Sequence, residues 1–143
     1  MEQGRQRSVL IVSLPGNLEL VSSAFEREIR VHGALDEATA LRLCDAHRPD
    51  VVLVGYHFDE MRPYRVIRAL RNAPSSRDST LILFCMLPTD RDALDARVIS
   101  ETYRTMGCAE FVDLRREAAE RGPAGAAAVL RQRVLPYLTS ERS

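Results

Sequence analysis

Five short hydrophobic runs, each closed by a turn and followed by a stretch with helical spacing of apolar residues, divide this chain into five similar units. Several runs are apolar at every position, which is typical of strands buried on both faces of a parallel sheet. Helices must then cover both faces, so we predict a single α/β domain. The predicted strands are Ser8–Ser13, Ile29–His32, Asp50–Tyr56, Thr80–Leu87 and Ala109–Asp113.

Residues that favour helix starts follow the strand runs. A side-chain oxygen or a proline at such a position satisfies or removes a free backbone N–H group in the first turn. The predicted starts are Asn17, Asp36 and Pro63, with Thr89 and Asp92 forming a capping box for the fourth helix. The last helix is predicted for Pro123–Leu138, and the charged segment Arg115–Gly122 is predicted to add a helical turn on the surface before it.

Composition limits the functions of the chain. Its 143 residues, 45% of them hydrophobic, suffice for one domain, which we place at residues 8–138 between flexible ends at 1–7 and 139–143. The 20 basic and 20 acidic residues balance, so we expect no nucleic-acid partner. No apolar run approaches the ~20 residues of a membrane span, so we expect no membrane partner.

Cysteine and lysine content add two expectations. The three cysteines, Cys44, Cys85 and Cys108, are scattered and lie in apolar runs, which indicates inert core thiols and a cytoplasmic location. The basic residues are all Arg, so Schiff-base chemistry on Lys is excluded. The three histidines, His32, His47 and His57, lack metal-ligand spacing.

The spacing of the five strand runs resembles the CheY-like receiver domains of bacterial response regulators along almost the whole chain. This resemblance implies a flavodoxin-like, doubly wound sheet of five parallel strands in the order 2-1-3-4-5. In that family an acidic pair ends the first strand, a phosphate-accepting Asp the third, a Thr or Ser the fourth and a Lys the fifth. The matching positions here are Ser13 and Leu14, Gly55, Met86 and Leu114.

These substitutions imply a degenerate member of the family, a pseudo-receiver. Mg²⁺ needs several oxygen ligands, and phosphoryl transfer needs a carboxylate nucleophile beside a cation. We therefore predict no aspartyl phosphorylation, no metal, no cofactor and no catalysis, and a protein that acts in signal transduction by binding another signalling protein.

The resemblance implies that partners bind to the fourth helix, the fifth strand and the fifth helix, and that the chain forms a homodimer through the same face. The candidate contacts there are Tyr103, Arg104, Met106 and Phe111. A second candidate surface is a stripe of Arg residues on the third helix, which either docks an acidic partner or is a solvated face. The stripe consists of Arg62, Arg65, Arg68 and Arg71, with Arg65 and Arg68 as its central members.

Two other functions remain open at the strand ends. The Pro15–Gly16 loop offers backbone N–H groups at a helix start for a small anion or nucleotide, although it matches no phosphate-binding motif. Ser13, His57 and Asp59 would lie at one sheet edge, as in a hydrolase, but Ser13 lacks the glycine-flanked turn that exposes a catalytic serine.

Overall fold

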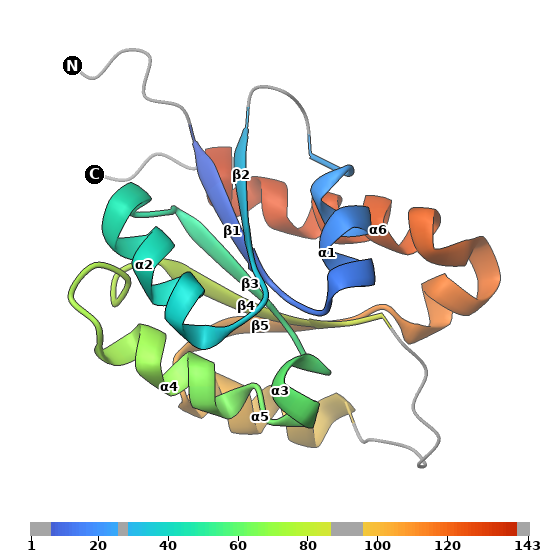
Figure 1. Ribbon diagram of the computed structural model, residues 1–143. Coiled ribbons are helices and arrows are strands. Elements are labelled where there is room, and N and C mark those ends of the chain that lie inside the picture. Colours follow the sequence, from blue (N-terminus) through green and yellow to red (C-terminus); the bar gives the residue numbers. More distant parts are fainter. Residues whose placement is uncertain (1–6, 26–28, 87–95, 140–143) are drawn as a thin grey trace.

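The computed structural model describes residues 7–25, 29–86 and 96–139 and contains one five-stranded parallel sheet (Figure 1). Its strand order is β2-β1-β3-β4-β5, which confirms the predicted order. Adjacent strands are all parallel, so each connection crosses over the sheet. The strands are β1 (Ser8–Val12), β2 (Arg30–Ala34), β3 (Val51–Gly55), β4 (Thr80–Cys85) and β5 (Cys108–Asp113).

Helices cover both faces of the sheet, as Figure 1 shows. They are α1 (Pro15–Ser22), α2 (Glu37–His47), α3 (Phe58–Met61), α4 (Tyr64–Asn72), α5 (Ala96–Thr105) and α6 (Arg115–Thr139). Side chains alternate along each strand, so Ile11 and Phe84 join the core beneath α1 and α6, whereas Leu10 and Leu83 join the core beneath α2, α4 and α5. No helix of the described residues is both long enough and apolar enough to cross a membrane.

Four of the five strands end at different residues from those predicted: β1 ends at Val12 and β3 at Gly55, each one residue early, β4 ends at Cys85 and not at Leu87, and β2 ends late. The edge strand β2 continues to Ala34, beyond the predicted end at His32, because its pairing with β1 extends through Gly33. A Cβ atom on Gly33 would lie 2.7 Å from Leu18 Cδ1, so the absence of a side chain lets α1 pack closely against this strand. Strand β4 ends at Cys85, one residue before Met86.

The helix starts agree with the sequence signals at two of the three predicted positions that are described. Asp36 caps α2, its Oδ1 accepting a hydrogen bond of 2.8 Å from the backbone N–H of Thr39. Helix α4 begins at Tyr64, directly after Pro63. Helix α1, however, begins at Pro15 and so includes Asn17, because a proline fits the first turn, where no backbone donor is needed. The predicted capping box at residues 89–92 lies outside the described residues.

The segment before the last helix forms the predicted additional turn. Helix α6 begins at Arg115 and is interrupted at Gly122, whose φ of 81° and ψ of 171° are not helical, and it resumes from Pro123. The short helix α3 was not predicted, and its Asp59 and Glu60 both have a φ of 57°. Left-handed backbone at two consecutive acidic residues is unusual and leaves no simple sequence signal.

Arg71 belongs to the structural framework and not to a docking stripe. Its Nη2 donates a 2.7 Å hydrogen bond to the carbonyl oxygen of Gly107, and its Nη1 donates to the carbonyls of Arg77 and Ser79. A Cβ atom on Gly107 would lie only 2.6 Å from Arg71 Nε. Arg71 therefore joins α4 to the loops that precede β4 and β5, and the prediction that it shares a binding stripe with Arg68 is wrong.

We expect the Arg71→Met variant to lower the free energy of unfolding by roughly 2 kcal/mol, since several carbonyl oxygens lose a charged donor. Urea denaturation followed by circular dichroism measures this change. Arg68→Met is the matched control on the same helix, because its side chain is exposed, and it should change stability by less than about 0.5 kcal/mol. Equal effects of the two substitutions would contradict the structural role of Arg71.

Candidate functional site

The carboxyl ends of the strands meet at one edge of the sheet, where binding sites of doubly wound folds usually lie. Ser13 directly follows β1, Gly55 ends β3 and Leu114 directly follows β5. Ser13 and Leu114 are each only 1% exposed, whereas Leu14 is 36% exposed. This edge is therefore closed at its centre and carries an apolar side chain at its surface.

The closest packing at this edge is between β1 and β3. A Cβ atom on Gly55 would lie 2.9 Å from Ser13 Oγ and 3.5 Å from Ser13 Cβ. Carbon and oxygen atoms that are not bonded pack well at separations of about 3.5 Å or more, so the shorter contact requires the Ser13 hydroxyl to move. The Ser13 side chain thus occupies the space from which any side chain of residue 55 would have to emerge.

The fourth strand contributes a thiol to this edge, in place of the methionine expected there. Gly55 pairs with Phe84, and Cys85 pairs with Asp113, so Cys85 is the last residue of β4. Met86 belongs with Phe84 to the core beneath α1 and α6. Because side chains alternate along a strand, Cys85 points to the opposite face, and the assignment of Met86 to the functional end of this strand is wrong.

A cation is present at the fifth strand, one residue after the expected position. Leu114 is buried in the core beneath α1 and α6, but Arg115 follows it. The Arg115 guanidinium donates to both carboxylate oxygens of Asp113, with Nε–Oδ1 at 2.8 Å and Nη2–Oδ2 at 2.7 Å. These hydrogen bonds hold the pKa of Asp113 below its ordinary value. The sequence signal for this arrangement was the Asp-Leu-Arg order at the strand end.

Five side chains at the ends of β3, β4 and β5 form what we call the thiol cluster: Tyr56, His57, Cys85, Phe111 and Arg115. Cys85 Sγ lies 3.7 Å from His57 Nε2. The Tyr56 ring meets His57 edge-on with the ring centroids 5.6 Å apart, and its centroid lies 6.4 Å from that of Phe111. The pKa of Tyr56 is raised, first by burial and then by Cys85, and Arg115 opposes this change.

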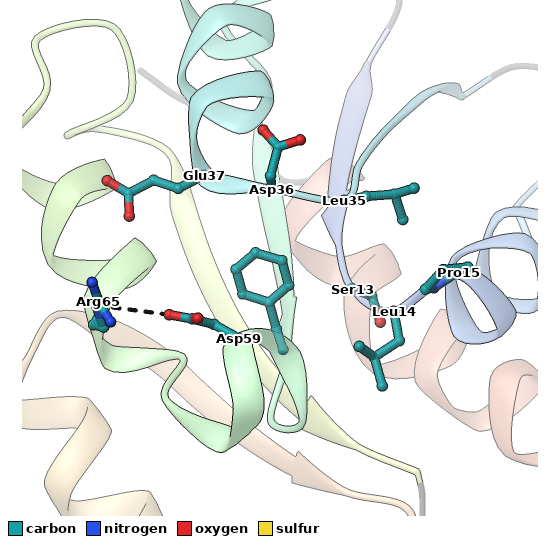
Figure 2. Close-up of a pocket in the computed structure, with 9 residues that line it drawn as sticks. Ser13, Leu14, Pro15, Leu35, Asp36, Glu37, Asp59 and Arg65 are labelled. Atoms are coloured by element: carbon teal, nitrogen blue, oxygen red, sulfur yellow. Dashed lines mark ion pairs between the residues drawn. The ribbon is translucent and has the colours of Figure 1, made fainter.

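A separate pocket of about 260 Å³ lies over the ends of β1, β2 and β3 (Figure 2). Figure 2 shows Leu14 and Leu35 on one side of it and the Asp59–Arg65 ion pair on the other. Leu35 is 51% exposed and so adds an apolar surface beside the acidic side chains of the pocket. The lining residues are Ser13, Leu14, Pro15, Leu35, Asp36, Glu37, Phe58, Asp59 and Arg65.

The pocket does not suit the ligands of a phosphorylatable receiver. Mg²⁺ needs several oxygen ligands, and the positions that match the receiver site supply only the hydroxyl of Ser13 besides backbone carbonyls. The carboxylates of the pocket lie instead at the starts of α2 and α3. No group of three or more His, Cys, Asp or Glu side chains that could hold a metal occurs in residues 7–25, 29–86 and 96–139. Three carboxylates repel an anion, and Pro15 lacks an N–H, so the lining disfavours the anion-sensor alternative.

The three side chains of the hydrolase alternative have other neighbours. Asp59 lies 3.5 Å from the guanidinium of Arg62 and 3.8 Å from that of Arg65. His57 Nε2 faces Cys85, and Ser13 packs against the backbone of β3. A catalytic triad requires the carboxylate to orient the imidazole and the imidazole to contact the hydroxyl, and the contacts described here follow a different order.

The candidate interface residues fall into two groups. Tyr103 is only 8% exposed, and burial is the largest cause that raises its pKa to about 12, so its side chain does not have the surface exposure that was expected. Its place on the inward-facing stripe of α5 explains the error. Met106 and Phe111 are half-buried, and Arg104 is exposed. The sequence analysis missed Val98, which is 56% exposed on the same helix.

The two central Arg residues of α4 remain at the surface. Arg65 pairs with Asp59, whereas the Arg68 guanidinium carbon lies 6.0 Å from the centroid of the exposed Tyr64 ring. This geometry fits a weak cation–π contact. The structure thus leaves Arg65 and Arg68 accessible to a partner.

Comparisons with known proteins place this geometry in context. No family model matches the chain. A curated relative, the cyclic di-GMP phosphodiesterase response regulator RpfG of Xanthomonas campestris pv. campestris (strain 8004), is 36% identical over 75 residues, which cover 50% of this chain and 20% of that protein. The match therefore spans about a fifth of the length of the relative.

Solved structures match nearly the whole chain. The phosphorylated cyanobacterial phytochrome response regulator RcpA aligns with a TM-score of 0.72 at 12% identity, covering 96% of this chain and 98% of that one. A response regulator from Thermotoga maritima aligns with a TM-score of 0.70 at 17% identity, covering 95% and 100%. The chemotaxis response regulator CheY4 of Vibrio cholerae aligns with a TM-score of 0.65 at 15% identity, and the alignment covers 90% of this chain and 98% of that one. The chain therefore has the CheY-like flavodoxin fold of response-regulator receiver domains.

Proposed function

We propose that this chain is a phosphorylation-independent pseudo-receiver that acts as a protein–protein interaction module in bacterial signal transduction. Its partner is another signalling protein, and the two proteins bind in the cytoplasm. The proposal rests on the receiver fold, on the similarity to a protein named as a response regulator, and on the strand-end chemistry. It assigns no catalytic step to the chain.

The packing of Ser13 against Gly55 carries the proposal. An aspartyl phosphate needs a carboxylate at the end of β3, and Gly55 has none. The 2.9 Å separation between a Cβ at residue 55 and Ser13 Oγ means that restoring a side chain there also requires the Ser13 side chain to move. The two residues together support a fold whose phosphorylation function is lost.

Two surfaces support partner binding. On α4, Arg65 and Arg68 can hold carboxylates of an acidic partner, because a guanidinium presents paired donors. On α5, the exposed Val98 and Arg104 form an apolar and a basic contact point, and the half-buried Phe111 of β5 lies on the same side of the sheet as that helix. We propose that this second surface, with β5 and α6, also forms a homodimer.

We expect treatment with acetyl phosphate and Mg²⁺ to leave the mass of the protein unchanged, since neither the acceptor nor the metal ligands are present. Intact-mass spectrometry measures this, with a phosphorylatable receiver treated in parallel as the positive control. An adduct of one phosphoryl group that disappears in the Asp59→Asn variant would overturn the proposal.

We expect Gly55→Ala to lower the free energy of unfolding by about 1–3 kcal/mol, because the added methyl group overpacks against Ser13. In a Ser13→Gly background the same change should cost at least 1 kcal/mol less, roughly the coupling expected for contacting residues. Urea denaturation of the four proteins of this double-mutant cycle measures the coupling. A Gly55→Ala variant as stable as the starting protein would refute the closed-site argument.

We expect the double variant Arg65→Glu/Arg68→Glu to lose capture of a partner from native lysate while its melting temperature stays nearly unchanged, since exposed charges add little to stability. Arg116→Glu is the matched control, because Arg116 is also exposed but lies on α6. If the double variant captures the partner as well as the control does, these two Arg residues are solvated surface residues without a binding role.

A further inference from the structure

The three thiols of this chain lie in different chemical surroundings. Cys108 is buried at the start of β5, and burial raises its pKa to about 11. Burial also raises the pKa of Cys44 on α2. Cys85 instead has an imidazole nitrogen 3.7 Å from its sulfur. The pKa of the nearby Arg115 is raised mainly by its hydrogen bond with Asp113, and Cys85 adds a smaller contribution.

We propose that Cys85 and His57 form a thiolate–imidazolium pair that reacts with peroxides, which makes Cys85 a site of reversible oxidation. A nucleophile within hydrogen-bonding reach of a base, with a third group that holds the base in place, is the usual arrangement of an activated thiol. Tyr56 contacts the imidazole edge-on and is the third group here. The positive charge of Arg115 favours the thiolate further.

The proposed oxidation needs only the Cys85 thiol, the His57 imidazole and one molecule of peroxide. When Nε2 is unprotonated, the Cys85 thiol donates its hydrogen bond to it, and proton transfer gives the thiolate and the imidazolium. The thiolate sulfur attacks one peroxide oxygen, so that an S–O bond forms and the O–O bond breaks. Sulfur loses two electrons and becomes a sulfenic acid, and the leaving hydroxide takes the proton from His57 to become water.

The position of the other thiols determines how an oxidised Cys85 can be reduced. Cys108 pairs with Leu81, four residues before Cys85 on β4, which corresponds to about 13 Å along the strand. A disulfide needs Cα atoms about 4.4 to 6.8 Å apart, so Cys108 cannot resolve the sulfenic acid. We therefore include in the proposal that a thiol outside the domain reduces the sulfenic acid, through a mixed disulfide.

Access to the sulfur requires local opening of the structure, because the side chain is buried. Cys85 is 1% exposed, and it ends its strand at the sheet edge beside the half-buried His57. Local opening at a strand end costs less free energy than global unfolding. Global unfolding would expose Cys44 and Cys108 equally, so these two thiols are internal controls for any reaction that requires it.

The test treats the whole chain with hydrogen peroxide in the presence of dimedone, which traps sulfenic acids, and maps each cysteine by peptide mass spectrometry. We expect trapping at Cys85 to be at least about tenfold faster than at Cys44 or Cys108. We expect His57→Gln to slow trapping at Cys85 by about tenfold. Equal rates at the three thiols, or an unchanged Cys85 rate in His57→Gln, would overturn the proposal.

A second measurement keeps the test decisive if His57→Gln loosens the fold, which faster labelling of Cys44 and Cys108 would reveal. The rate of Cys85 alkylation by iodoacetamide in the starting protein is measured from pH 5 to pH 9. A thiolate that is paired with an imidazolium still reacts at pH values below the ordinary thiol pKa of about 8.5. The rate of Cys85 alkylation should therefore fall only at pH values well below 8.5. A rate that falls away at or above pH 8.5 would overturn the pairing.

Discussion

The approach of β1 to β3 at their carboxyl ends constrains everything else at the edge of this sheet. The Ser13 hydroxyl lies where a side chain of residue 55 would begin, and Gly55 leaves that space free. A receiver that is phosphorylated must keep several carboxylates close together, which costs free energy through mutual repulsion. Here a small hydroxyl and a glycine replace that arrangement with close packing.

Closing the centre of the edge separates its polar groups into two sets. The pocket over β1, β2 and β3 has acidic and apolar walls, whereas the thiol cluster over β3, β4 and β5 combines an imidazole, a thiol and a guanidinium. In the pocket, Asp59 faces two Arg side chains, and Asp36 caps a helix, so both carboxylates already have structural partners. The thiol cluster instead places a thiol beside an imidazole, and a proton can pass between these two groups. For this reason we place the proposed reactive chemistry in the thiol cluster.

The sequence was sufficient to predict the sheet, its strand order and most helix positions, because buried runs such as Val51–Val54 and caps such as Asp36 act locally. It was not sufficient where the outcome depends on contacts between distant segments. Helix α1 begins at Pro15 and not at Asn17, since two local signals competed. The burial of Tyr103 depends on α4 packing beside it. A hydrophobic run also cannot show which residue ends a strand, and this is why Met86 was assigned a role that the position of Cys85 fits better.

The end of the fifth strand carries a leucine at the position where the resemblance to receivers would place a lysine, and an arginine one residue later. Leu114 turns into the core beneath α1 and α6, where a charged side chain would be costly. Arg115 then places its guanidinium at the edge, but two hydrogen bonds fix it to Asp113. A guanidinium held in this way has little freedom to follow a phosphoryl group that comes and goes. In the proposed oxidation, the same guanidinium favours a thiolate at Cys85, and the paired carboxylate of Asp113 offsets part of its charge.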